Sequence, residues 1–271
     1  MKTLYIDCGM GAAGDMLTAA LLELLPEEDR ERFTEEFNLI GIPEVIMNVY
    51  SSVKCGIMGT HVSMLIEGEE EGTGGYKHEH GHNHSHEHSH IYTDGSAHTH
   101  IHTGMGSIEH IICDHLSVSD KVKGDIQAIY NMIAEAESSV HGVPVTDIHF
   151  HEIGSMDAFA DITAVCMLME RISAEQIIIS PVNTGSGTVK CTHGILPVPA
   201  PATAYILKGV PVYSNGIRSE LTTPTGAALL KHFATGFGTM PVMRIDRIGY
   251  GMGTKDFDAA NCVRVMMGIA F

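Results

Sequence analysis

The densest group of side chains that could bind a metal lies just past the middle of the chain. On an extended strand, His149 and His151 would point to the same face, and Glu152 follows them directly. Asp157 and Asp161 are four residues apart, which places them on one side of a helix. Two imidazoles with nearby carboxylates can hold a borderline divalent metal such as nickel, zinc or cobalt. We therefore expect a metal site here, the alternative being a half-exposed histidine pair with Asp157 favouring the helix dipole.

A glycine-rich junction near the N-terminus is a second candidate site. A short apolar strand ends at Asp7, and Gly11 and Gly14 then allow the backbone to turn into a helix at Asp15. The free amides of such a junction can bind phosphate, although the segment matches neither the dinucleotide-binding fingerprint nor a P-loop. Its two acids also suit a cation or a hydroxyl-rich ligand. A tight turn without any ligand is the alternative.

Two further segments carry polar side chains that could bind a ligand. Between residues 183 and 203, glycines and prolines predict a shaped loop without a regular element. In it, Cys191 and His193 could supply metal ligands, or a nucleophile and its base. Pro224 suits the first turn of a helix, and free amides and hydroxyls around it suit a phosphate or a carboxylate. These hydroxyls belong to Thr222, Thr223 and Thr225. A functionless loop and a plain capped helix start are the alternatives.

Histidines are concentrated in one stretch, residues 68 to 106. Its composition cannot form a packed core, so we expect a mobile insertion. Histidines at every second position cannot build one fixed tetrahedral site, but they provide many exchangeable sites for nickel, zinc, copper or cobalt. A solvated spacer is the alternative to metal loading. The histidines of this tract are His78, His80, His82, His84, His86, His88, His90, His98, His100 and His102.

Alternating strand and helix patterns place these segments in an α/β fold with a mixed sheet and a disordered histidine-rich insertion. An apolar stripe from Val122 to Val140 predicts an amphipathic helix, capped by Ser119 and ended by Gly142. We expect other helices at 14–25, 157–171, 202–207 and 224–233 and one ending near 37. Strands are expected at 3–7, 44–53, 61–67, up to 151, and at 176–181, 243–248 and 262–269. Residues 1–67 and 107–271 together form the α/β body around the insertion.

Composition excludes several classes of protein. The chain of 271 residues has a net charge of −17 with histidine counted as neutral, and this argues against binding to nucleic acid. No apolar run is long enough to cross a membrane, and no signal pattern begins the chain. The six cysteines are widely spaced, as expected for reduced thiols. We expect a cytoplasmic protein that binds neither nucleic acid nor a membrane, and a homo-oligomer is compatible with the sequence.

Taken together, these segments resemble the nickel insertion family of nickel-pincer cofactor biosynthesis. The specific strings are H-F-H-E followed by the two aspartates, L-P-V-P-A-P-A-T at 196–203, E-L-T-T-P-T-G-A at 220–227 and Y-G-M-G-T-K-D-F at 250–257. The histidine-rich insertion after the early hairpin is a further similarity. Members of this family are usually longer, with a C-terminal domain that this chain lacks. The resemblance therefore covers the body of the chain and implies that a separate partner chain supplies the C-terminal domain.

The resemblance implies a CTP-dependent cyclometallase of the lyase class. Such an enzyme inserts Ni2+ into pyridinium-3,5-bisthiocarboxylic acid mononucleotide, and the product is the cofactor of lactate racemase, whose apoenzyme is the acceptor. CTP with Mg2+ or Mn2+ would bind the C-terminal domain. A nickel–carbon bond requires loss of a proton, and the bases we expect are Asp157, Asp161 and Glu152. His149 and His151 would hold the metal, the glycine turn or the threonine segment would hold the phosphate, and the histidine tract would raise the local nickel concentration.

Two other functions remain open at this stage. The histidine tract favours a nickel store or metallochaperone without any reaction of its own. A metal-dependent hydrolase could use His149 and His151 with the two aspartates to activate water.

Overall fold

The computed structural model describes residues 1–66, 69–70, 104–148, 150 and 155–271. These residues form an eight-stranded mixed sheet in the order β10-β5-β1-β12-β11-β3-β2, with β4 paired to β3. The strands are β1 (Lys2–Asp7), β2 (Val45–Lys54), β3 (Ile57–Ile66), β4 (Glu69–Glu70), β5 (Gln176–Ile179), β10 (Gly236–Phe237), β11 (Met243–Met252) and β12 (Cys262–Ala270). The β1–β5, β5–β10 and β3–β11 pairs are parallel, whereas β1–β12, β11–β12, β2–β3 and β3–β4 are antiparallel.

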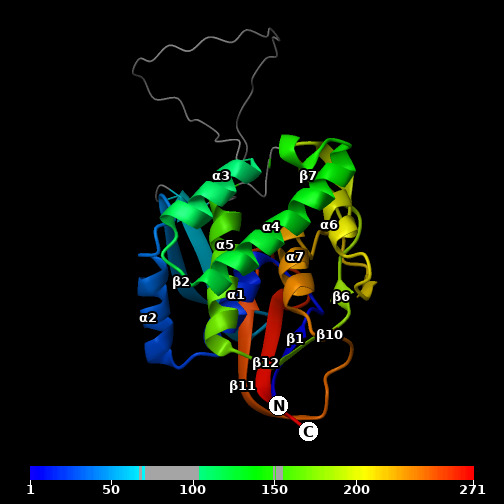
Figure 1. Ribbon diagram of the computed structural model, residues 1–271. Helices are drawn as coiled ribbons and strands as arrows, with labels where there is room; N and C mark the ends of the chain where they lie inside the picture. Colours follow the sequence, from blue (N-terminus) through cyan, green and yellow to red (C-terminus); the bar gives the residue numbers. More distant parts are fainter. Residues whose placement is uncertain (67–68, 71–103, 149, 151–154) are drawn as a thin grey trace, which may run out of the picture.

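Helices are layered on one side of this sheet (Figure 1). Helix α1 lies directly on β11, β3 and β12, α5 packs on α1, and α4 crosses outermost over α5, α6 and α7. The helices are α1 (Gly14–Glu23), α2 (Glu27–Phe37), α3 (Met105–His110), α4 (Asp120–His141), α5 (Met156–Ile172), α6 (Pro201–Ile206) and α7 (Pro224–Phe233). A π-helix, η1 (Ile111–His115), and a 3-10 helix, η2 (Val145–Asp147), also occur. Among the described residues, no helix is both long and apolar enough to cross a membrane.

Glycines bring α1 into direct contact with the sheet. A Cβ atom at Gly251 would lie 1.8 Å from the carbonyl oxygen of Met16, and one at Gly249 would lie 2.0 Å from that of Ala20. No larger residue fits at either position, because the backbones of β11 and α1 already touch there. This contact fixes where the first turn of α1 stands above the sheet.

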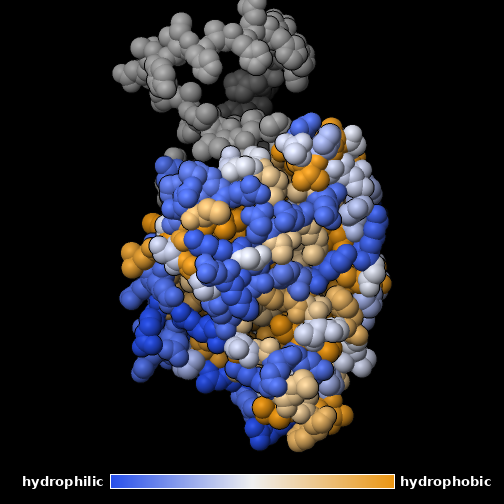
Figure 2. Space-filling model, viewed as in Figure 1, coloured by the Kyte–Doolittle hydropathy of each residue, from blue (hydrophilic) through white to orange (hydrophobic). Residues whose placement is uncertain are grey.

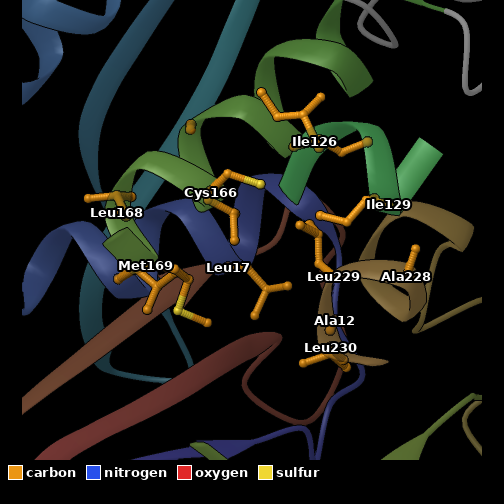
Figure 3. Packing of buried hydrophobic residues seen from close by; sticks show 14 of the residues in the cluster. Ala12, Leu17, Ile126, Ile129, Cys166, Leu168, Met169, Ala228, Leu229 and Leu230 are labelled. Atoms are coloured by element: carbon orange, nitrogen blue, oxygen red, sulfur yellow. The ribbon is translucent and has the colours of Figure 1, made fainter. Parts of the chain in front are cut away.

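The core lies between the sheet and the helices. Leu17 of α1, Ile129 of α4 and Leu229 of α7 gather between their helices, and each is almost completely buried (Figure 3). Burying one such side chain contributes about 1.5–3 kcal/mol. Hydrophilic side chains cover the outer surface of α4, as expected for an amphipathic helix (Figure 2). The core therefore holds α1 and α7, two of the helices that form the site described below.

Most of the expected elements are confirmed. The Ser119 hydroxyl accepts a hydrogen bond from the Val122 amide at the start of α4, and Gly142 ends this helix in the left-handed conformation. The expected α/β fold with a mixed sheet is likewise confirmed. Of the insertion expected at 68–106, residues 71–103 with all ten histidines of the tract lie outside the described residues, whereas Glu69–Glu70 form β4 and α3 begins at Met105. The strand expected up to His151 is described only in part, and its beginning is the 3-10 helix η2.

One expectation was wrong. Residues 183–203 are not free of regular elements, because β7 (Thr188–Cys191) and β8 (Gly194–Pro197) form an antiparallel hairpin. Thr192 and His193 form the tight turn, Gly194 follows it with a φ of 104°, and Pro197 ends the second strand. A second small sheet pairs β6 (Val182–Asn183) with β9 (Val212–Tyr213). The glycine and proline that suggested a loop therefore mark the beginning and the end of the second strand of a hairpin.

Candidate functional site

The N-terminal ends of three helices meet at one cavity of about 320 Å³, which we call the acidic cavity. Helix α1 contributes its first residues, α5 its first two turns and α7 its first turn, while β3 closes another side. The helix dipoles place partial positive charge at this point. The lining residues are Ala13, Gly14, Asp15, His61, Val62, Ser63, Met64, Asp157, Ala158, Asp161, Glu220, Thr223, Pro224, Thr225 and Thr254.

Backbone contacts hold the starts of α1 and α7 together. The Ala12 amide donates to the carbonyl oxygen of Leu221 at 3.0 Å, and the Thr223 amide donates to that of Ala12 at 3.1 Å. A Cβ atom on Gly226 would lie 2.1 Å from the Ala12 carbonyl oxygen, so this position requires glycine. The Thr223 hydroxyl caps α7 by accepting from the Gly226 amide at 3.1 Å. Two segments more than 200 residues apart therefore form one wall of the cavity.

Three aspartates, Asp15, Asp157 and Asp161, line the cavity. Burial raises the pKa of the Asp15 carboxyl, with the charge of His61 opposing the shift. The pKa of Asp161 is raised well above its usual range, first by burial and then by the charges of Asp15 and Asp157. A hydrogen bond from the Asp15 backbone amide opposes that shift. Within the described part of the chain, Asp157 Oδ1 and Asp161 Oδ1 are buried and have no hydrogen-bond partner. Such atoms would gain most from a bound cation or proton.

His61 is a cavity residue that sequence analysis missed. It lies in β3, is only 5% exposed, and its Nδ1 is 2.6 Å from the carbonyl oxygen of Met252. Its ring also contacts that of Tyr50, with centroids 5.0 Å apart. A histidine among apolar strand residues looks like an ordinary strand position, and no local signal distinguishes it. Glu220 and Thr254 also line the cavity without having been singled out.

Of the residues expected to bind substrate, four line the cavity. Gly14, Asp15, Thr223 and Thr225 do so, together with the candidate bases Asp157 and Asp161.

The other expected substrate residues lie elsewhere. Asp7 pairs with Arg264 at 2.7 Å and borders a separate hollow beside Cys262. Gly11 has a φ of 80°, and a Cβ atom there would lie 2.0 Å from the Leu221 carbonyl oxygen. Thr222 is buried, and its hydroxyl donates to the Asn183 carbonyl oxygen at 2.8 Å. These contacts position the backbone around the cavity.

Cys191 and His193 border a second cavity of about 320 Å³, beside the C-terminal end of α4. The ring of His193 lies 4.8 Å from that of His141, measured between centroids. Glu220 and Pro224 line both cavities, so the two are neighbours. All six cysteines belong to the described residues and none forms a disulfide.

Most of the expected metal ligands lie outside the part of the chain that the structure describes. His149, His151 and Glu152 lie outside the described residues, as do the histidines of the tract. Within residues 1–66, 104–148 and 155–271, no group of three or more histidine, cysteine, aspartate or glutamate side chains is arranged to hold a metal ion.

Comparison with known proteins adds a family context. Residues 4–270 match the family model described as nickel insertion protein. A protein of Geobacillus kaustophilus named pyridinium-3,5-bisthiocarboxylic acid mononucleotide nickel insertion protein is 38% identical over 270 residues. Proteins of the same name from Clostridium kluyveri and Staphylococcus saprophyticus are 39% and 36% identical. The alignments cover 97–99% of this chain but only 59–62% of these relatives, so the chain spans about 60% of their length. No solved structure matches.

Proposed function

The chain belongs to the nickel insertion protein family, and we propose that it takes part in inserting Ni2+ into pyridinium-3,5-bisthiocarboxylic acid mononucleotide. The names of its relatives support this substrate. The product would hold nickel between two sulfur atoms and one ring carbon. The relatives are longer than this chain, so the activity is proposed for this chain together with the part of the relatives that the alignment does not cover.

The acidic cavity is the observation that carries this proposal. Forming the nickel–carbon bond breaks a ring C–H bond, the carbon keeps the electron pair, and the proton must pass to a base. Asp161 suits this role, because its raised pKa makes its ionised form a stronger base than an ordinary carboxylate. The unpartnered Oδ1 atoms of Asp157 and Asp161 are where a proton or a cation would be stabilised most. Glu152 remains a proposed alternative base, and His149 and His151 remain proposed metal ligands.

The substrate phosphate would lie at the start of α7. Thr223 and Thr225 line the cavity there, and the helix start contributes amides and a favourable dipole. Gly14 and Asp15 would contact the substrate at the start of α1, with Gly11 and Thr222 positioning the backbone. Cys191 and His193 remain proposed as auxiliary metal ligands in the neighbouring cavity.

No step is assigned to CTP. Of the described residues that line the acidic cavity, none is a lysine or an arginine, so its walls do not fit a triphosphate. A requirement for CTP with Mg2+ or Mn2+ is proposed on the family resemblance alone, through a C-terminal domain or partner chain. The same resemblance proposes a cytoplasmic cyclometallase of the lyase class, whose product serves a lactate racemase apoenzyme.

The decisive experiment supplies the chain with Ni2+, CTP and the dithiocarboxylate mononucleotide. The reaction is run with and without a C-terminal partner chain, and nickel–sulfur absorbance is followed. New absorbance in either condition is expected, and its absence in both would overturn the proposal.

Deleting residues 68–106 separates an enzyme from a nickel store. An enzyme should keep its turnover in excess nickel, whereas a store should lose its bound metal. Hydrolysis of the nucleotide without nickel insertion would favour a hydrolase.

A further inference from the structure

The imidazole of His61 has a defined tautomer. A carbonyl oxygen only accepts hydrogen bonds, so the Nδ1 of His61 must donate its proton to the Met252 carbonyl oxygen at 2.6 Å. In the neutral ring, the lone pair then belongs to Nε2. The hydrogen bond also fixes the orientation of the ring, because Met252 belongs to the neighbouring strand β11 and is fully buried.

This arrangement is typical of histidines that bind metals. Metal-binding histidines almost always donate their other ring N–H to a carboxylate, a carbonyl or water, which orients the ring and makes the ligand nitrogen more basic. His61 and Asp15 line the same cavity. An imidazole and a carboxylate therefore line the same cavity as Asp157 and Asp161, whose buried Oδ1 atoms have no hydrogen-bond partner among the described residues.

A site that passes nickel on should hold it with few ligands. Closed protein sites with four ligands keep their metal, whereas open sites leave positions for incoming groups. His61 and Asp15 would supply two ligands, which leaves coordination positions for the sulfur atoms of the substrate. Nickel also accepts imidazole nitrogen readily, and it accepts the softer sulfur of a thiocarboxylate as well.

We propose that His61, with Asp15, holds the incoming Ni2+ in the acidic cavity before it passes to the two sulfur atoms of the substrate. This inference rests on the proposed function, since that function supplies both the nickel and the sulfur ligands. During transfer, the bonds from nickel to His61 and Asp15 break as the nickel–sulfur bonds form. Nickel stays divalent throughout, and the ring proton leaves separately to the base.

The test measures nickel binding at the cavity itself, using the full chain. Ni2+ with nitrogen and oxygen ligands is paramagnetic, so titrating it into deuterated, 15N-labelled protein broadens amide signals near the bound ion. The reporters are the amides of Ala13, Val62 and Ser63, which line the cavity and distinguish it from nickel bound by the histidine tract. His61→Asn keeps an N–H donor near Met252 but removes Nε2, and His61→Gln is the second variant.

Both variants should need at least about tenfold more nickel to broaden the reporter signals. His232→Asn is the control, because His232 is a half-buried histidine whose Nε2 lies 2.9 Å from Asp125 Oδ1, near the C-terminal end of α7 and away from the cavity. It should leave the titration unchanged. Unaltered broadening in folded His61→Asn and His61→Gln would overturn the inference and leave nickel insertion standing. Broadening that depends on His61 in a protein that inserts no nickel would retain the site and overturn the proposed function.

Discussion

Gly14 lies directly against Asp161, so the start of α1 and the second turn of α5 share one small space. A Cβ atom on Gly14 would be 2.6 Å from both the Cβ and the Oδ2 of Asp161. At separations below 3.0 Å, either the new Cβ atom or the Asp161 side chain would have to move. The Asp161 carboxyl is itself held by a hydrogen bond from the Asp15 backbone amide. The absence of a side chain at residue 14 is therefore what allows this carboxyl to stand at the cavity wall.

Replacing this glycine should displace the aspartate. We expect Gly14→Ala to destabilise the protein by about 1–3 kcal/mol, the usual range for overpacking, and to lower nickel insertion strongly. Urea denaturation and nickel–sulfur absorbance measure the two effects. Gly124→Ala is the control, because a Cβ atom there meets nothing within 4 Å inside α4. It should instead stabilise the protein by about 0.5–1 kcal/mol. Equal behaviour of the two variants would refute the importance of this contact.

Replacing the carboxyl of Asp161 should raise the stability of the protein and lower its activity. Asn keeps the shape of the side chain but cannot ionise, so Asp161→Asn relieves the burial of a carboxylate whose pKa is raised. We expect a gain of about 1 kcal/mol in the free energy of unfolding at pH 7, and a loss of about 100-fold or more in single-turnover nickel insertion. If this variant inserts nickel at the normal rate, a group other than Asp161 accepts the proton.

Local sequence signals predicted the elements better than they predicted the site. The cap at Ser119 and the end at Gly142 depend on neighbouring residues, and both were confirmed in α4. Asp15, Asp161 and Thr223 were each singled out within separate segments. Their meeting in one cavity depends on backbone contacts such as that between Ala12 and Leu221, which local patterns do not contain.

The surroundings of His61 and Asp7 show the same limit. His61 acquires its special geometry from the Met252 carbonyl, 191 residues away. Asp7 was expected at a ligand site, but it lies opposite Arg264 in the antiparallel pairing of β1 and β12. Such a cross-strand partner is set by the register of the sheet and cannot be inferred from the glycine turn that follows Asp7.

The helix cap at Thr223 should affect both stability and function. Thr223→Ala removes the hydrogen bond to the Gly226 amide and should cost about 1 kcal/mol of unfolding free energy. It should also weaken binding of the mononucleotide, because Thr223 lines the acidic cavity. Ser119→Ala is the matched control, since this hydroxyl caps α4 away from the cavity. Ser119→Ala should lose a similar amount of stability and keep its affinity for the mononucleotide. Calorimetric titration measures the nucleotide affinity of both variants. Equal affinities in both variants would remove Thr223 from the substrate site.

The raised pKa of Asp161 gives stability and activity opposite pH dependences. Between the ordinary aspartate pKa of 3.8 and its raised value, the folded protein binds more protons at this group than the unfolded chain does. Its contribution to stability is therefore complete at low pH and is lost as the pH rises through this window, with a slope of at most about 1.4 kcal/mol per pH unit. In the folded protein the ionised form that accepts the proton becomes populated as the pH approaches the raised value, so the rate of nickel insertion should rise with pH.

Comparing the wild type with Asp161→Asn isolates this group from all other titrations. Urea denaturation between pH 4 and about pH 8 should show the stability advantage of the variant growing as the pH increases. Over the same range, the rise in single-turnover rate should be present in the wild type and absent from the variant. A stability difference that does not change with pH would mean that Asp161 titrates normally, and the acidic cavity would then lack the strong base that proton removal requires.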